Sequence, residues 1–303
     1  MGDVADVNFT LVQLRYFVTA AELGSMTAAS RELMVAQSAI SAAIAQVERE
    51  LGVQLLIRHH ARGLSLTRAG ERFLVEARDF LSHAAALAES ARGLAGSLSG
   101  ELAVGCFTTL SPFYLPKLLR QFADRHPGVR VTLSEGEISA VQRALVDGRC
   151  EVALLYAIDL ALDLDVRVLT RVRPYVLLPS GHAMADAEAV SLVELASEPM
   201  ILLDLPHSRD YFRALHPVEP RVRFRSSSYE TVRALVAGGH GYSILNQRAV
   251  TDQTYDGGYV VSRPISEEVP FLDIVLASMR GVRLTARATA FTETCEAFFA
   301  NLS

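Results

Sequence analysis

Apolar residues recur at helical spacing in three short stretches near the N-terminus. In the third stretch, Ile40, Ile44 and Val47 follow one another in steps of four and three residues, which places them on one helix face. The spacing predicts three short helices over about 11–22, 27–33 and 37–51. Gly24 and Gly52 follow the first and third of these, where helix C-termini favour glycine.

A short basic hairpin follows the third helix. Leu55–Arg58 and Gly63–Leu66 are predicted as two strands around the segment HHARG. Three short helices followed by such a hairpin form the layout of a winged helix-turn-helix, which places one helix in the DNA major groove. Gln37, Ser38 and Ser41 lie on the exposed front of the third helix. A helix that served only to build the core would not need polar residues at these positions. We therefore expect this part to bind double-stranded DNA.

A heptad pattern runs along a long helix that Thr67 caps. Its apolar positions alternate in steps of four and three residues, an unbroken a/d seam. They are Phe73, Ala77, Phe80, Ala84, Leu87, Ala91, Leu94 and Leu98. The seam predicts that the helix pairs with a copy of itself, through Phe73, Phe80, Leu87 and Leu94. The alternative is a helix that lies on its own domain, but the many alanines permit close approach of two helices and favour pairing.

Glycines and serines between residues 93 and 100 mark a hinge, and the pattern then changes to alternating strands and helices. ELAVGC, VRVTLSE and EVALLY predict strands, separated by helices over Pro112–His126 and Ile138–Asp147. The alternation indicates βαβ units and a parallel sheet. It repeats up to a last helix over Thr285–Leu302, which predicts two α/β subdomains between which the chain crosses twice.

Composition and charge bear on where the protein works in the cell and on what it can bind. The chain of 303 residues has no apolar run of the ~18 residues that span a bilayer, and its start lacks the features of a secretory signal. Its three cysteines, Cys106, Cys150 and Cys295, lie far apart, which fits a reducing cytoplasm. They are apolar fillers or, alternatively, include a redox-sensing pair. The net charge is −5, but residues 1–70 carry six Arg against six acidic residues, so a neutral head can bind DNA if its arginines cluster.

Enzyme signatures are absent from the sequence. It contains no GxSxG, HExxH, P-loop or GxGxxG after the first α/β strand, and its eight histidines lack metal-ligand spacing. We expect no enzyme activity, no cofactor and no metal. The rival interpretation is an α/β small-molecule-binding protein or enzyme with an accessory helical domain. The polar front of the third helix beside a basic wing distinguishes the two, because an enzyme would not need it.

The whole chain resembles the LysR-type transcriptional regulators. The segments FVTAAELGSMTAASREL, ELGVQLLIR and LSLTRAGERFL match the family closely. The resemblance implies a winged helix-turn-helix, a long linker helix, and a two-subdomain α/β effector domain shaped like a periplasmic binding protein. It also implies a cytoplasmic homo-oligomer, a dimer of dimers, that binds DNA and a small-molecule co-inducer and has no contact with a membrane.

The expected domain organisation has three parts. They are a DNA-binding domain over 1–66, a dimerising linker helix over 67–98 and an effector-binding domain over 101–303. Within the last, subdomain I covers about 101–170 and 273–303, and subdomain II covers about 171–272. The expected fold class is α/β with an all-α N-terminal part.

The resemblance assigns roles to residues of the DNA-binding domain. In the family the third helix enters the major groove and the wing touches the backbone, so Gln37, Ser38 and Ser41 are implied base or phosphate contacts. The implied phosphate contacts are Thr27, Arg31, Arg58, His59 and Arg62. The family usually has a Ser cap, then Gln-Pro, then Ser-Arg. Here Ala36 leaves the third helix uncapped, at a cost of ~1 kcal/mol, and Ala42 removes a groove contact.

The carboxyl ends of the predicted strands mark a ligand cleft, as in other open α/β sheets. These loops match the places where the family binds co-inducers. The effector-binding candidates are Thr108, Thr109, Glu137, His207, Ser208 and Ser228. Two helix N-termini with hydroxyls facing one cleft favour an anion or carboxylate, although ordinary N-capping by the same hydroxyls is a compatible interpretation.

Charged residues near the cleft leave the effector open. Glu135 and Glu137 are either surface residues or select an amine-bearing effector. Arg221, Arg223 and Arg225 alternate along one strand, which predicts a solvated or interface face, or alternatively an Arg225 that reaches the cleft. The effector, the operator and the direction of regulation do not follow from these residues.

Overall fold

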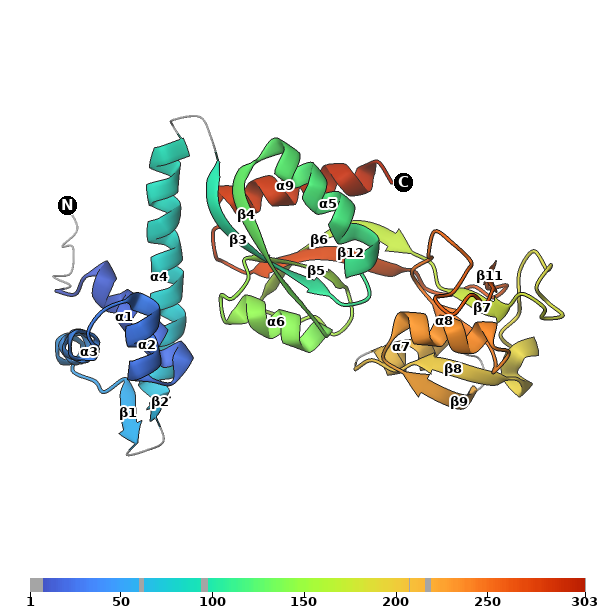
Figure 1. Cartoon of the computed structure of the whole chain (residues 1–303), viewed down its shortest axis with the longest axis horizontal. Coiled ribbons are helices and arrows are strands. Elements are labelled where there is room, and N and C mark those ends of the chain that lie inside the picture. Colours follow the sequence, from blue (N-terminus) through green and yellow to red (C-terminus); the bar gives the residue numbers. More distant parts are fainter. Residues whose placement is uncertain (1–7, 60–62, 94–97, 207, 216–218, 303) are drawn as a thin grey trace. The chain divides into compact units, whose positions relative to one another are not determined.

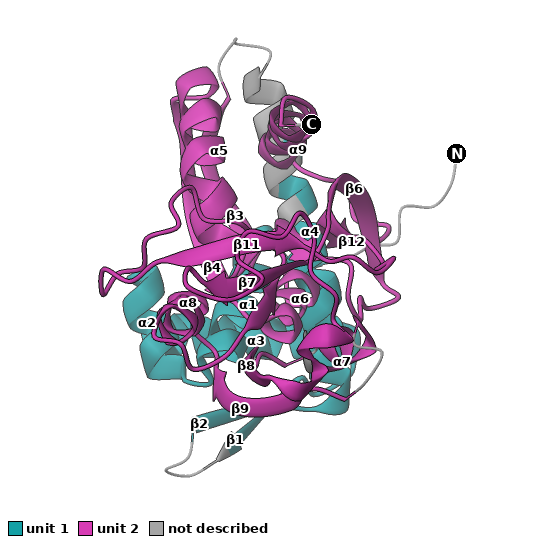
Figure 2. Ribbon diagram, turned by 90° about the vertical axis from the view of Figure 1, so that its right-hand side faces the viewer, with its two compact units in different colours: residues 1–97 teal, residues 98–303 magenta. Residues whose placement is uncertain are grey.

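The computed structural model describes residues 8–59, 63–93, 98–206, 208–215 and 219–302 (Figure 1). The chain divides into two compact units, Met1–Ser97 and Leu98–Ser303, which Figure 2 draws in teal and magenta. Each unit has a hydrophobic core of its own, so each can be described as a separately packed body.

The N-terminal unit contains the three short helices and the hairpin that the sequence predicts. Its elements are α1 (Leu11–Leu23), α2 (Met26–Leu33), α3 (Gln37–Leu51), β1 (Leu56–His59), β2 (Gly63–Leu66) and α4 (Arg68–Gly93). β1 and β2 pair antiparallel. Ile40, Ile44 and Val47 of α3 are buried in one cluster with Leu14 and Phe17 of α1, which confirms the face that the spacing predicts.

Side-chain caps set where these helices begin. The Ser25 hydroxyl accepts a hydrogen bond from the N–H of Ala28 at 3.2 Å and starts α2. The Thr67 hydroxyl accepts one from the N–H of Gly70 at 2.9 Å at the start of α4, as predicted. Ala36 precedes α3 without a side-chain cap, so the first N–H groups of α3 are available to other acceptors.

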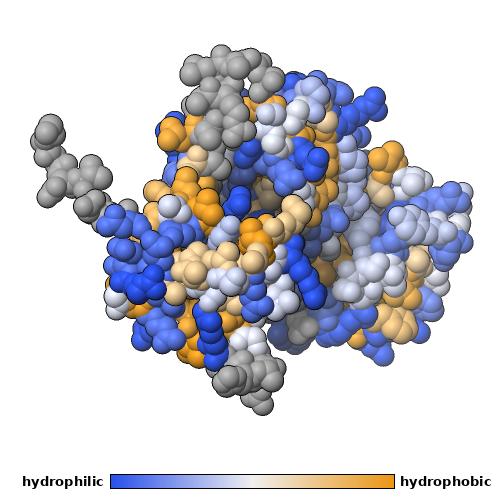
Figure 3. All heavy atoms as spheres, turned by 60° about the vertical axis from the view of Figure 1, so that its left-hand side comes forward, coloured by the Kyte–Doolittle hydropathy of each residue, from blue (hydrophilic) through white to orange (hydrophobic). Residues whose placement is uncertain are grey.

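The apolar residues of α4 divide between two environments. Phe73 packs on Phe17, with ring centroids 5.3 Å apart, and Ala77 is buried, so the first turns lie on the chain's own unit, as the alternative interpretation expects. Further along, Phe80 is 55% exposed and Leu87 is 74% exposed. Leu94 lies outside the described residues. Hydrophobic areas lie among hydrophilic ones on the face of the molecule that Figure 3 shows.

The first half of the C-terminal unit is a five-stranded sheet in the order β4-β3-β5-β12-β6. Its strands are β3 (Ser99–Phe107), β4 (Gly128–Gly136), β5 (Val152–Tyr156), β6 (Leu164–Val172) and β12 (Leu272–Met279). β3 pairs parallel with β4 and β5, but β12 runs antiparallel to β5 and β6. The strand-helix alternation thus correctly predicts the parallel pairing of β3 with β4 and β5, while the antiparallel direction of β12 was not predicted. β12 enters this sheet on the return from the second half, so no crossover helix turns it parallel.

Helices cover both faces of this sheet. They are α5 (Ser111–Arg125), α6 (Ile138–Val146) and α9 (Ala286–Ala300). α5 and α9 lie together on one face and α6 lies on the other, against β3 and β5 (Figure 1). The central strand β5 is buried along its whole length, which explains its uninterrupted apolar sequence VALLY.

The described residues of the second half form five more strands. They are β7 (Tyr175–Pro179), β8 (Pro199–Leu203), β9 (Arg221–Ser226), β10 (Ser243–Leu245) and β11 (Val260–Pro264). β7 pairs antiparallel with β10 and β11, and β8 pairs parallel with β9. Its helices are the short η1 (Glu194–Ser197), α7 (Ser208–Leu215) and α8 (Tyr229–Ala237). The chain passes between the halves after β6 and again after β11.

Candidate functional site

The front of α3 presents polar side chains away from the core. Gln37 and Ser38 are exposed and Ser41 is half-buried, while Ile40 between them has no exposed surface. This alternation follows from the helical period, because residues three and four apart share a face. The predicted front therefore exists as a surface.

Residues from α2 and from the wing meet this front. Thr27 Oγ1 of α2 lies 3.5 Å from Gln37 Oε1. Arg58 of β1 donates a hydrogen bond from Nη2 to Ser41 Oγ at 2.8 Å. Arg31 is exposed in the last turn of α2. The side chain of His59 and the whole of Arg62 lie outside the described part of the chain.

The hydrogen bond between Arg58 and Ser41 is a feature that sequence reasoning missed. It fixes an exposed guanidinium against the α3 front, where an arginine can meet a phosphate or a guanine edge. Gln37 supplies an amide of the kind that pairs with adenine. The uncapped N–H groups at the start of α3 add donors for a phosphate. Together these groups suit a nucleic-acid duplex.

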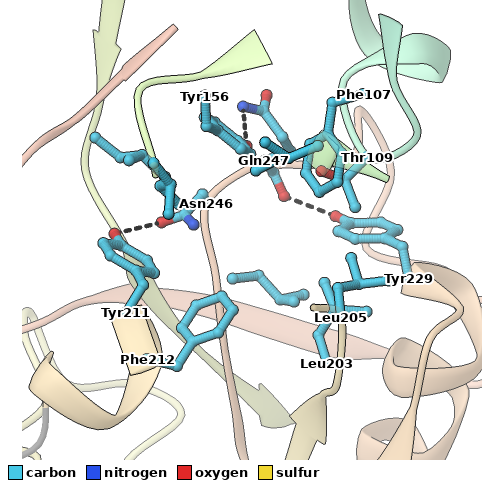
Figure 4. Close-up of a pocket in the computed structure, with 14 residues that line it drawn as sticks. Phe107, Thr109, Tyr156, Leu203, Leu205, Tyr211, Phe212, Tyr229, Asn246 and Gln247 are labelled. Atoms are coloured by element: carbon cyan, nitrogen blue, oxygen red, sulfur yellow. Dashed lines mark hydrogen bonds between the residues drawn. The ribbon is translucent and has the colours of Figure 1, made fainter. Parts of the chain in front are cut away.

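A pocket lies between the two halves of the C-terminal unit (Figure 4). Its empty space is about 420 Å³, part of which opens to solvent. The first half contributes Phe107, Thr109, Ile138, Tyr156, Ile158 and Leu272. The second half contributes Leu203, Leu205, Tyr211, Phe212, Tyr229, Leu245, Asn246 and Gln247. The pocket is thus built from both halves, at the ends of β3, β5, β8 and β10.

Gln247 joins the two halves at this pocket. Its amide Nε2 donates to the Tyr156 hydroxyl at 2.8 Å, and its Oε1 accepts from the Tyr114 hydroxyl at 2.8 Å. Both tyrosines belong to the first half. The carbonyl oxygen of Gln247 accepts from Tyr175 at 2.6 Å and from Tyr229 at 2.7 Å, both in the second half. A change in the angle between the halves that moves Gln247 away from Tyr114 and Tyr156 therefore breaks these hydrogen bonds.

The other polar groups of the pocket are also neutral. The Tyr211 hydroxyl donates to Asn246 Oδ1 at 3.1 Å. Burial raises the pKa of Tyr156, Tyr211 and Tyr229, so these hydroxyls stay protonated near neutral pH and act as donors. The pocket therefore offers amides, hydroxyls and aromatic rings.

The six predicted effector residues occupy different places. Of these, Thr109 lines the pocket and is only 7% exposed. Thr108 beside it is exposed, and the exposed Glu137 precedes α6 without capping it. Ser228 caps α8 by accepting from the N–H of Thr231 at 3.3 Å. His207 and the side chain of Ser208 lie outside the described residues.

Sequence reasoning missed the residues that dominate the pocket. Asn246 and Gln247 directly follow β10, whose sequence the pattern identifies as a strand. The rule that ligands bind beyond the carboxyl ends of strands points to them just as it points to Thr109. Tyr156 ends β5 in the same way. The partners of these residues come from distant segments, and nothing in the sequence connects them.

The three cysteines are buried, and all are free thiols. Burial raises the pKa of Cys106 to about 12 and that of Cys150 to about 11, and it also raises the pKa of Cys295. The described residues contain no group of His, Cys, Asp and Glu that could hold a metal ion. Within the same residues, no helix has the length and apolar character needed to cross a membrane.

Two family models match most of the chain. The model described as bacterial regulatory helix-turn-helix protein, lysR family, matches residues 11–71. The model described as LysR substrate binding domain matches residues 95–300. The matched segments contain the α3 front and the pocket, respectively.

Individual proteins agree with the family models. An uncharacterised HTH-type transcriptional regulator from Bacillus subtilis, YvbU, is 31% identical over 92% of this chain and 95% of its own. A probable hydrogen peroxide-inducible genes activator from Streptomyces viridosporus is 30% identical over 94% of this chain and 91% of its own. The crystal structure of HinK from Pseudomonas aeruginosa, 38% identical, covers 96% of this chain and 99% of that one with a TM-score of 0.65. The chain therefore belongs to the LysR family of bacterial transcriptional regulators, with a DNA-binding helix-turn-helix unit and the family's substrate-binding domain.

Proposed function

We propose that this chain is a cytoplasmic regulator without enzyme activity, in which a small molecule bound at the pocket controls DNA binding by the α3 front. The observation that carries the proposal is the position of Gln247, which lines the pocket and hydrogen-bonds both halves of the domain. A ligand that fills this space contacts both halves at once. It therefore favours one angle between them over another, which is the requirement for a ligand-driven switch.

The proposed DNA contacts are those around the α3 front. Gln37, Ser38 and Ser41 face the bases or the backbone of the major groove, and Thr27, Arg31 and Arg58 face phosphates. His59 and Arg62 extend this set onto the wing. The proposed assembly is a homo-oligomer, a dimer of dimers, held in part by the exposed apolar residues of α4, such as Phe80 and Leu87.

The test begins with a thermal-shift screen of small carboxylates, amino acids and aromatic compounds on the full-length protein. A compound that binds only the folded state raises its melting temperature. For a compound found in this way, Thr109→Val should weaken binding by about tenfold, because the variant keeps the shape of a buried position and removes one hydrogen bond. Binding to a duplex from the promoter next to the protein's own gene should remain nearly unchanged in a gel shift.

Thr108→Val is the matched control, because Thr108 is exposed beside Thr109 and does not line the pocket. It should leave both ligand binding and DNA binding as they are. If Thr109→Val loses DNA binding and keeps the response to the compound, the signal does not enter at this pocket. The effector domain would then be an assembly scaffold.

Oxidation of a thiol is a second candidate signal, because one relative is named a probable hydrogen peroxide-inducible genes activator. The environment of the three cysteines in this chain disfavours it. Each is buried, and each has a raised pKa, whereas peroxide reacts with accessible thiolates. We therefore propose ligand binding as the signal.

A further inference from the structure

The described lining of the pocket carries no charged side chain. Among the 14 lining residues that the structure describes there is no Asp, Glu, Lys, Arg or His. The only ionisable groups among these 14 residues are three tyrosine hydroxyls, which burial keeps neutral. A ligand in this space therefore meets dipoles and apolar surface, and no formal charge from these residues.

Two cations among the described residues near the lining are engaged elsewhere. Arg225 lies 3.6 Å from Asp204, and Arg248 stacks over the ring of Tyr175 at 4.8 Å. Ser228 caps α8, so one of the N–H groups at the start of this helix, that of Thr231, is already satisfied. A carboxylate in the pocket would lose its hydration without gaining a cation from the described lining residues, which weakens binding by roughly a hundredfold or more.

Polar groups and apolar side chains are unevenly divided around the space. Figure 4 shows Gln247 and Thr109 on one side and Leu203, Leu205 and Phe212 on the other. The amide of Asn246 and the hydroxyl of Tyr211 add a second polar point. This division suits a flat, apolar molecule with a hydrogen-bonding group at one end.

We infer that the effector is an uncharged ring compound, aromatic or alicyclic, that carries one or two neutral hydrogen-bonding groups. This inference rests on the proposed function, in which the pocket is the effector site. It differs from the expectation from sequence, which favoured an anion at two helix N-termini. The aromatic walls contributed by Phe107, Tyr211 and Tyr229 fit such a ring by stacking or edge contacts.

The experiment compares matched neutral and anionic probes on the full-length protein. Benzamide and benzoate form one pair, and phenylacetamide and phenylacetate form another. Each is added at increasing concentration at pH 7.5 while the melting temperature is measured. At about ten times its dissociation constant, a neutral probe should raise the melting temperature by about 3 °C, and its carboxylate partner should not. If neither neutral probe raises the melting temperature, the inference is overturned, whether or not a carboxylate binds.

Two tryptophan variants locate the bound probe. Ile158 is half-buried in the pocket wall, so Ile158→Trp should fill the space and remove the shift. Leu162 is 86% exposed and does not line the pocket, so Leu162→Trp should keep the shift. If Ile158→Trp does not fold, Ile158→Phe replaces it.

The outcomes separate the two proposals. A shift with carboxylates alone that Ile158→Trp abolishes retains the pocket as the effector site and refutes the uncharged ligand. A shift with neutral probes that persists in Ile158→Trp refutes the pocket itself, and with it both proposals. A neutral-only shift that Ile158→Trp removes supports both.

Discussion

Gln37 and Arg31 are proposed to make two different kinds of DNA contact, the first with a base and the second with a phosphate. Gln37 is exposed on the α3 front, where an amide can pair with adenine, and Arg31 is exposed on α2. Gln37→Ala should cost about 1–3 kcal/mol on the operator and relax discrimination between related duplexes. Arg31→Ala should weaken binding to all duplexes alike and reduce the salt slope by about one. Gel shifts at several salt concentrations, on the operator and on a scrambled duplex, measure both effects.

The comparison between the two variants decides the assignment. If Gln37→Ala weakens binding to the operator and the scrambled duplex equally, Gln37 touches the backbone and does not read bases. The groove assignment of α3 would then be wrong, although the helix-turn-helix unit would remain a DNA-binding unit.

At the level of single residues, the sequence predicts those properties that depend only on local geometry, such as which helix face a residue occupies. The helical period places Gln37 and Ser41 on one front without knowledge of the fold. The hydrogen bond between Ser41 and Arg58 depends on how the wing folds back, and it could not be predicted. Gln247 is a stronger case, because its side-chain partners Tyr114 and Tyr156 lie 133 and 91 residues away in sequence.

Helix α4 is the element through which we expect the chain to associate with a second copy of itself. Leu87 is 74% exposed on the heptad seam, so a second copy of α4 would cover it. Leu87→Glu should weaken self-association by roughly a hundredfold, because an unpaired buried charge costs about 3 kcal/mol or more. Val75, 41% exposed on α4 and off the seam, offers Val75→Glu as the control, which should leave association unchanged. Light scattering over a dilution series measures both, and an unchanged mass for Leu87→Glu would mean that other surfaces hold the oligomer.

Elements differ in how much of their environment the sequence determines. The period of four and three residues predicts α4 as a helix, but it does not separate Phe73, which packs on Phe17, from Leu87, which is exposed. The alternation of strands and helices predicts α/β subdomains but not the direction of β12. That direction depends on the path by which the chain returns from β11, which is a property of the whole domain.

At the scale of the whole molecule, two bodies divide the functions. The N-terminal unit holds the α3 front, and the C-terminal unit holds the pocket. The sequence indicates a hinge through its glycines and serines between residues 93 and 100, and α/β subdomains through the alternation of strands and helices. It does not predict what the pocket selects, because its lining combines loops and strand ends from Phe107 to Leu272.

For the whole molecule, an experiment can decide whether the regulatory signal is oxidation of a thiol or binding of a ligand. With a pKa of about 12 for Cys106 and about 11 for Cys150, the thiolate fraction at pH 7.5 is below about one in a thousand at either position. A raised folded pKa means that thiolate forms only as the pH rises toward that value, so neutral pH keeps these groups inert. Treatment of the folded protein with hydrogen peroxide at pH 7.5 should therefore oxidise none of the three thiols. A thiol titration after the treatment should still count three per chain, and the gel shift should be unchanged.

The same peroxide treatment in denaturant is the control, because unfolding removes the burial that protects Cys106, Cys150 and Cys295. There the thiols should be lost quickly, which would show that the reagent is active and that the fold provides the protection. Loss of even one thiol in the folded protein, together with a changed gel shift, would make oxidation a signal in its own right. An unchanged folded protein leaves the pocket as the route by which a chemical signal reaches the α3 front.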